Sequence, residues 1–378
     1  MTSMKRIIIA SDSFKGCLSS MQVAAAVEQG VHKVCPECEI IKLNVADGGE
    51  GTVEALLDTL GGHLQTVTVS DPLGRPVSAS YGILADGLTA VMEMSAASGL
   101  PLLSMEERNP MKTSTYGTGE MIKDAMSRGC RKFLVGIGGS ATNDGGMGML
   151  TALGFRFLDD AEMPLDGIGE NMSKVQKIDT LGVLNAVAES EFIVACDVDS
   201  PFYGPKGAAY VFSPQKGADA AMTEELDRGM RHLADVISST MNKDISNVPG
   251  AGAAGGLGGA FVAFLNARLE RGVDMVLDAI HFDEIIKGSD MVITGEGRID
   301  FQTLTGKTPF GVMARARKQD VKVAAIGGTV LLSADDDVSG FDIILQASPE
   351  GMPLSQAMQP QVAMENVSTA AERIMKML

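Results

Sequence analysis

Apolar runs and helical patterns alternate at both ends of the chain. Apolar runs at residues 6–10 and 40–45 are each followed by a pattern of helical period, at residues 20–34 and 50–60. Near the end, the same reasoning predicts three further strands and two further helices. These are strands at 290–294, 321–326 and 341–345 and helices at 309–318 and 360–378. This β-α alternation is typical of a parallel sheet.

The middle of the chain has a different pattern. Apolar and polar residues alternate over residues 66–69 and 77–84, and the turn-forming segment Pro72–Pro76 lies between them. A strand at 90–94 follows, and this arrangement predicts a partly antiparallel sheet. Two later apolar runs, at 132–135 and 192–195, predict further strands of the same region.

These patterns predict an α/β protein with two domains, because 378 residues exceed what one ordinary core supports. Residues 1–66 and 284–378 would form one doubly wound domain with a parallel sheet. Residues 67–283 would form a large inserted α/β domain with a mixed sheet. Two domains would leave a cleft between them, where we expect the active site.

Composition narrows the classes of partner. The formal net charge of −17 argues against a nucleic acid or an anionic membrane as partner. The apolar run near the N-terminus is too short for a signal segment or a membrane span. If the substrate is an anion, lysines and arginines inside glycine-rich segments must bind it locally.

The five cysteines are few and odd in number, which disfavours a disulfide framework and favours a reducing cytoplasm. Cys35 and Cys38 have the spacing of a redox or half-zinc motif. No second pair follows, and the four histidines are dispersed. We therefore predict an ordinary loop between a helix and a strand, with a metal or redox role as the alternative.

Glycine-rich segments follow several predicted strands, where open α/β sheets bind ligands. The segment Asp12-Ser13-Phe14-Lys15-Gly16 precedes a helix, and a lysine there suits a phosphate or carboxylate. The segment Asp47-Gly48-Gly49-Glu50-Gly51 begins the next helix. Asp47 could hold Mg²⁺ or accept a proton, whereas a structural turn needs only one of these glycines.

The segment Gly136–Gly146 carries the strongest local signal. Its glycines and hydroxyl groups could surround a polyphosphate with backbone N–H donors. It also matches a dinucleotide-binding pattern, but so glycine-dense a segment satisfies many patterns by chance. Later, Asp197 and Asp199 follow a strand and point the same way in extended chain. Either could bind Mg²⁺ or orient a hydroxyl nucleophile, or simply cap the turn before Pro201.

Two more segments complete the set, Gly252–Gly259 and Thr294–Asp300. In the second, Glu296 could bind a metal and Arg298 a phosphate, or the two could pair only with each other. Gly306-Lys307-Thr308 resembles the end of a P-loop. The glycine required five residues earlier is Phe301, so Walker A is absent. No nucleophile elbow, zinc-protease motif or protein-kinase catalytic loop is found.

Taken in order, these six segments closely resemble the glycerate kinase type 1 family over nearly the whole chain. The resemblance implies ATP- and Mg²⁺-dependent phosphorylation of D-glycerate, mostly at the 2-hydroxyl. It also implies a flavodoxin-like domain made from both chain ends, an inserted α/β domain and a site between them. Phosphorylation at the 3-hydroxyl is the alternative. Assembly into a homodimer is also compatible with the sequence.

Combining the resemblance with the chemistry of phosphoryl transfer, we assign candidate roles to site residues. The catalytic candidates are Asp197, Asp47 and Lys15, with Asp197 and Glu296 as metal ligands. The candidates for binding nucleotide are Gly138, Gly139, Ser140, Thr142, Asn143, Gly295 and Glu296. The candidates for binding glycerate are Asp12, Ser13, Lys15, Gly48, Gly49 and Arg298. An NAD-dependent oxidoreductase and a non-catalytic acid-binding sensor are the alternatives from other classes.

Overall fold

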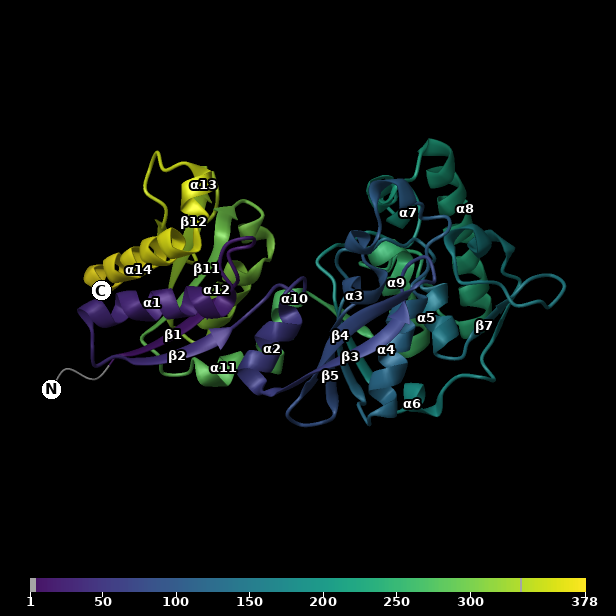
Figure 1. Cartoon of the computed structure of the whole chain (residues 1–378), viewed down its shortest axis with the longest axis horizontal. Helices are drawn as coiled ribbons and strands as arrows, with labels where there is room; N and C mark the ends of the chain where they lie inside the picture. Colours follow the sequence, from purple (N-terminus) through teal and green to yellow (C-terminus); the bar gives the residue numbers. More distant parts are fainter. Residues whose placement is uncertain (1–4, 334) are drawn as a thin grey trace. The chain divides into compact units, whose positions relative to one another are not determined.

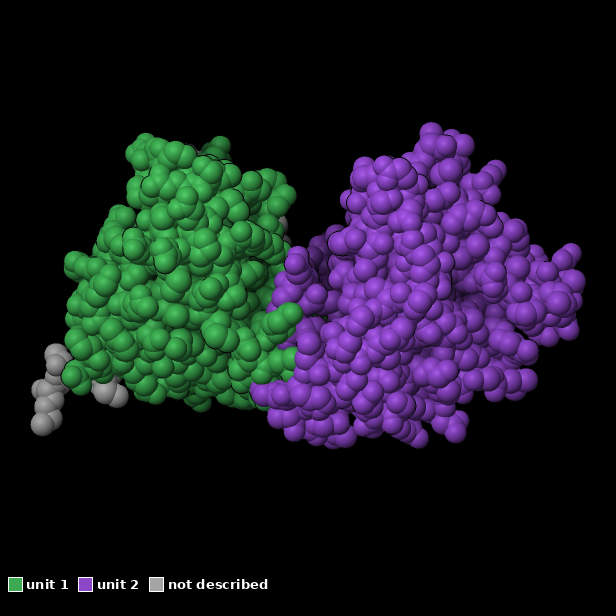
Figure 2. Space-filling model, in the orientation of Figure 1, with its two compact units in different colours: residues 1–47, 54–60, 273–378 green, residues 48–53, 61–272 purple. Residues whose placement is uncertain are grey.

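The computed structural model describes residues 5–333 and 335–378. By its internal contacts the chain divides into two compact units, shown in green and purple in Figure 2. Unit 1 contains the chain up to Asp47, Glu54–Leu60 and Val273–Leu378. Unit 2 contains Gly48–Val53 and Gly61–Gly272.

Unit 1 is built on a five-stranded parallel sheet in the order β13-β12-β11-β1-β2. Renumbered by their order along the chain, these strands have the flavodoxin-like order 2-1-3-4-5. The strands are β1 (Arg6–Ser11), β2 (Glu39–Asn44), β11 (Met291–Asp300), β12 (Lys322–Leu331) and β13 (Ile343–Gln346). The two ends of the chain therefore share one sheet, as the alternation of elements predicts.

The helices of unit 1 are α1 (Ser20–Val34), α2 (Thr52–Leu60), α10 (Gly272–Ala279), α11 (Phe282–Ile285), α12 (Thr308–Lys318), α13 (Leu354–Ala357) and α14 (Pro360–Met377). Helices α1, α12 and α14 pack against the strands of the sheet (Figure 1). Ile7, Ile8 and Ile9 have no exposed surface, as expected of a parallel strand covered on both faces. Helices α1 and α14 pack closely, because Gly30 leaves room for the backbone of Ser368.

Unit 2 has a mixed six-stranded sheet in the order β10-β9-β6-β5-β4-β3. Its strands are β3 (Gly62–Ser70), β4 (Pro76–Leu84), β5 (Thr89–Glu93), β6 (Lys132–Gly136), β9 (Glu191–Ala195) and β10 (Arg268–Glu270). Strands β3, β4 and β5 pair antiparallel, and the remaining pairs are parallel. A separate small ribbon pairs β7 (Arg156–Leu158) with β8 (Lys177–Asp179). The predicted mixed sheet is confirmed.

The helices of unit 2 enclose one large apolar core. They are α3 (Ser95–Ser98), α4 (Tyr116–Ser127), α5 (Met147–Ala152), α6 (Asn185–Ala188), α7 (Ala208–Phe212), α8 (Ala220–Met241) and α9 (Ala253–Leu265). Among the described residues, no helix is long and apolar enough to cross a membrane.

The loop between α1 and β2 holds Cys35 and Cys38, as predicted, but the two cysteines form a disulfide bond. The expectation of an ordinary loop was therefore incomplete, because the loop brings the two sulfur atoms into bonding distance. The remaining described cysteines, Cys17, Cys130 and Cys196, are free thiols.

Candidate active site

The site in unit 1 lies at the carboxyl end of β1, where the strand order of the sheet reverses. Strand β1 pairs with β11 only over Ile7–Ile9, whereas β11 continues to Asp300 alongside β12. The turn after β1 lies against this extension, because the Asp12 N–H donates to the Gly295 carbonyl at 3.0 Å. Open α/β sheets bind ligands at such a switch point.

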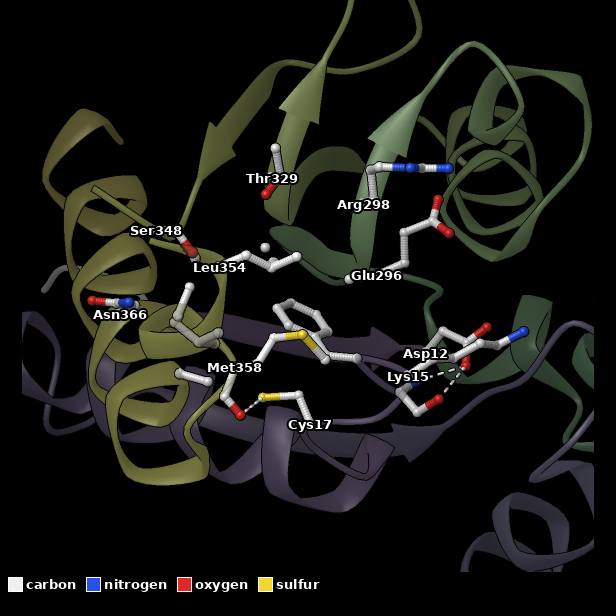
Figure 3. Close-up of a pocket in the computed structure, with 18 of the residues that line it drawn as sticks. Asp12, Lys15, Cys17, Glu296, Arg298, Thr329, Ser348, Leu354, Met358 and Asn366 are labelled. Carbon is white, nitrogen blue, oxygen red and sulfur yellow. Dashed lines mark hydrogen bonds between the residues drawn. The ribbon is translucent and has the colours of Figure 1, made fainter. Parts of the chain in front are cut away.

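A cavity of about 350 Å³ opens at this point and is lined only by residues of unit 1 (Figure 3). One end is strongly charged, and its titratable side chains come from the turn after β1, from β11 and from the loops that follow β2 and β11. They are Asp12, Lys15, Asp47, Glu296, Arg298 and Lys307. The structure thus brings together several residues that the sequence assigned to substrate, metal and catalysis.

Asp12 and Lys15 form the centre of the charged end. Burial and the neighbouring Asp47 raise the pKa of Asp12 to about 6. Its Oδ2 accepts a hydrogen bond from the Thr308 hydroxyl at 2.9 Å, and its Oδ1 accepts one from the Ser13 N–H. Burial lowers the pKa of Lys15, but Asp47, with Oδ2 at 3.5 Å from Nζ, and Asp12 raise it above its usual value. Lys15 therefore stays a cation.

Glu296 and Arg298 lie two residues apart on β11, so both can face the cavity. Burial raises the pKa of Glu296 to about 7. Within the described part of the chain, its buried Oε1 accepts no hydrogen bond. Arg298 forms an ion pair with Asp300 instead of Glu296, with Nε 3.0 Å from Asp300 Oδ2. A half-buried carboxylate with an unpartnered oxygen is chemically suited to a cation.

In unit 2, the Gly136–Gly146 segment is mostly packed inside the fold. Gly138 and Gly139 are exposed, whereas Ser140 is buried and Thr142 and Asn143 have no exposed surface. Lys216 is buried there too, and its Nζ donates to Ser140 Oγ at 2.7 Å and to the Thr142 carbonyl at 2.6 Å. Contact of a nucleotide with Thr142 or Asn143 would require this segment to open.

Lys216 lies at the end of the glycine- and lysine-bearing stretch that follows Asp197, but the sequence assigned it no role. Burial lowers its pKa to about 7, and the nearby Asp144 acts in the opposite direction. Its place before Gly217 is a weak local signal, because other lysines of the chain, such as Lys15 and Lys206, also precede a glycine. Its hydrogen bond to the Thr142 carbonyl, 74 residues away in the sequence, is visible only in the folded structure.

The glycines after β2 also have structural reasons. Gly48 has φ of +82°, and a Cβ there would lie 2.5 Å from the Ala195 Cβ. Glu93, at the end of β5, accepts hydrogen bonds from the N–H groups of Gly51 and Val53. A protein carboxylate thus already occupies the N-terminus of α2, next to Gly48 and Gly49, where the sequence placed glycerate.

Asp197 follows β9, as predicted, and its side chain is exposed. Its Oδ1 accepts a hydrogen bond from the Gly272 N–H at 3.0 Å, which fixes the carboxylate at the strand end. Asp197 belongs to unit 2 and Glu296 to unit 1. Residues 5–333 and 335–378 contain no group of three or more metal-ligating side chains, so the predicted metal pair remains a prediction.

Comparison with known proteins agrees with these observations. The model of the glycerate kinase family matches residues 7–378. The chain is 46% identical over 357 residues to a glycerate kinase of Bacillus subtilis, covering 94% of this chain and 93% of the relative. It is 42% identical over 374 residues to the glycerate 2-kinase of Escherichia coli, covering 98% and 97%.

The fold is shared as well. The crystal structure of a candidate glycerate kinase 2 from Salmonella typhimurium LT2 superimposes with a TM-score of 0.91 at 40% sequence identity. It covers 99% of this chain and 98% of its own. The chain therefore belongs to the glycerate kinase family.

Proposed function

We propose that this protein is a glycerate kinase that transfers the γ-phosphoryl group of ATP to D-glycerate, with the 2-hydroxyl as acceptor. The observation that carries the proposal is the identity of 42–46% to proteins named glycerate kinase, over almost the whole length of both chains. The 2-hydroxyl follows from the relative named glycerate 2-kinase.

The charged end of the unit 1 cavity supports this function. Phosphoryl transfer depends mainly on positioning and on neutralising the charge of the phosphate oxygens. Lys15, Lys307 and Arg298 supply three cations at one end of the cavity, in a chain of net charge −17. We assign these residues to the phosphates and, for Arg298, to an anionic oxygen of either substrate.

The side chains also fit a magnesium ion. Mg²⁺ is usually held by one or two carboxylates together with substrate phosphates, so a cluster of three acidic residues is not required. Glu296 would hold it through Oε1, the buried oxygen that accepts no hydrogen bond from residues 5–333 and 335–378. The ion would neutralise negative charge on the phosphate oxygens.

For the proton of the attacking hydroxyl we propose Asp197 as acceptor. Asp197 is exposed at the end of β9, and the Gly272 N–H holds its carboxylate in place. Asp47, which lies 3.5 Å from Lys15 Nζ in an ion pair, is the second candidate. The hydroxyl oxygen would attack the γ-phosphorus, the proton would pass to Asp197, and ADP would leave.

The proposal is tested by product formation. With ATP, Mg²⁺ and D-glycerate, the protein should form a phosphoglycerate that enolase converts directly, since enolase uses 2-phosphoglycerate. A product that needs a mutase first would support the 3-hydroxyl instead. ATP with Mg²⁺ should also raise the melting temperature, because a ligand that binds only the folded state stabilises it. Stabilisation by NADH instead would favour the oxidoreductase alternative.

A further inference from the structure

The cavity at the switch point has two unlike ends. Opposite the charged end, its wall comes from α13, α14 and the end of β13 (Figure 3). This second end, the apolar arm, is lined mainly by aliphatic side chains and carries two polar ones. Its residues are Ala347, Ser348, Leu354, Ala357, Met358, Ala363, Asn366 and Val367. None of these residues has a role in the phosphoryl-transfer chemistry described above.

An aliphatic wall does not suit glycerate as a ligand. Each of its three carbons carries an oxygen, and burying those oxygens against Leu354 and Met358 would remove hydrogen bonds to water without replacing them. ATP joins a flat apolar base to a charged triphosphate. A cavity with an aliphatic end and a cationic end matches that combination, and its volume of about 350 Å³ is in the usual range for small-molecule pockets.

We infer that the apolar arm binds the adenine of ATP and that the triphosphate extends from it toward Lys15 and Lys307. The inference rests on the proposed function, which supplies ATP as the phosphoryl donor. The sequence placed the nucleotide at both the Gly138–Asn143 segment and Gly295–Glu296. The inference keeps Glu296, which lines the cavity, and moves the base away from the Gly138–Asn143 segment to unit 1. The full burial of Thr142 and Asn143 agrees with this change.

Asn366 provides a means of recognising the base. It lies on α14, and its Nδ2 donates a hydrogen bond to the weakly accepting Met352 sulfur at 3.6 Å. A side-chain amide carries a donor beside an acceptor, and adenine presents the complementary pair on its edge. On the edge where adenine presents its amino donor and the N7 acceptor, guanine presents two acceptors, O6 and N7. Asn366 therefore makes the arm selective for ATP over GTP.

The main test truncates a wall of the arm. Leu354 is 69% exposed and so contributes little to the core. Leu354→Ala should weaken ADP binding by roughly tenfold, from the lost apolar contact, as measured by calorimetry. The Kd for inorganic pyrophosphate should not change. Leu331→Ala is the matched control, since Leu331 is 59% exposed at the end of β12 and does not line the cavity.

Kinetics separate this inference from the proposed function. In Leu354→Ala the KM for ATP should rise with the Kd for ADP, while the KM for D-glycerate stays the same. Asn366→Leu should lower the preference for ATP over GTP by about tenfold or more. Wild-type affinity for ADP in both variants, or a rise in the KM for D-glycerate alone, would overturn the inference. If instead the proposed function is wrong, the wild-type protein will bind ADP but form no phosphoglycerate.

Discussion

Asp144 offers a quantitative test of how the Gly136–Gly146 segment is held. Its side chain has no exposed surface and accepts four hydrogen bonds. Oδ2 accepts from the N–H and hydroxyl of Thr115, both at 2.8 Å, and from the Gly148 N–H at 3.2 Å, while Oδ1 accepts from the Gly146 N–H at 2.9 Å. Burial raises the pKa of Asp144, and these donors oppose that rise. Because all four groups donate, we expect a carboxylate.

Asp144→Asn keeps the shape but replaces one oxygen by a donor. If the amide oxygen keeps the three bonds of Oδ2, the amide nitrogen faces the Gly146 N–H. Losing that bond in a buried site costs about 2 kcal/mol, and weakening the other three by removing the charge costs roughly 1 kcal/mol more. We therefore expect the free energy of unfolding to fall by about 3 kcal/mol.

Urea unfolding followed by far-ultraviolet circular dichroism measures this difference. The control is Asp160→Asn, at an exposed position of the same unit, where a change within about 0.5 kcal/mol is expected. Asp144→Ala should cost more than Asp144→Asn, because it leaves four buried donors without an acceptor. If Asp144→Asn is as stable as the control, the residue is protonated in the folded protein and the reasoning is wrong.

Three further predictions follow from single residues. Asp197→Asn should lower kcat by roughly 10²–10⁴-fold while the melting temperature stays within a few degrees, as measured on one preparation; a near-normal kcat would shift the role of base to Asp47. In buffer without divalent cations, the folded-state pKa of Asp12 near 6 means that the folded protein binds more protons than the unfolded chain between about pH 4 and 6. The contribution of Asp12 to the free energy of unfolding should therefore fall by about 3 kcal/mol as the pH rises through that window. The urea midpoint should depend less on pH in Asp12→Asn than in the wild type. An equal pH dependence in the two proteins would contradict the assignment. Gly30→Ala should destabilise unit 1 by more than about 2 kcal/mol, because its Cβ would lie 2.1 Å from the Ser368 carbonyl oxygen; a wild-type urea midpoint would show that α1 and α14 can separate at little cost.

The sequence predicted the parts of the fold that depend on local periodicity. Most predicted strands and the terminal helices appear within a few residues of their expected bounds, and the parallel pairing of β1 with β11 is confirmed. The exceptions are β11 and β12, which continue to Asp300 and Leu331, beyond the expected ends at 294 and 326. The turn at Asp12 and the β11 segment at Glu296 were both recognised as sites. These two segments lie side by side because β1 and β11 are neighbours in the sheet. The βα alternation and the family resemblance together indicated that strand order.

The remaining features depend on contacts between distant segments, which leave no local pattern. Lys216 lies 74 residues from the Thr142 carbonyl that it binds, and Glu93 binds an N–H group 42 residues away. Gly48 was assigned to glycerate, but a side chain at this position would collide with the side chain of Ala195, which is distant in the sequence. The apolar arm was missed because Leu354 and Met358 resemble ordinary helix residues until α13 is placed beside the switch point.

The most direct test of the proposed function follows the γ-phosphoryl group of ATP with an isotopic label. The protein is incubated with ATP labelled at the γ-phosphate, Mg²⁺ and D-glycerate, and the products are separated. The account predicts that the label appears in 2-phosphoglycerate, in an amount equal to the ADP formed, and that omitting D-glycerate abolishes the transfer. Label that stays in ATP, or that appears only as inorganic phosphate regardless of D-glycerate, would contradict it.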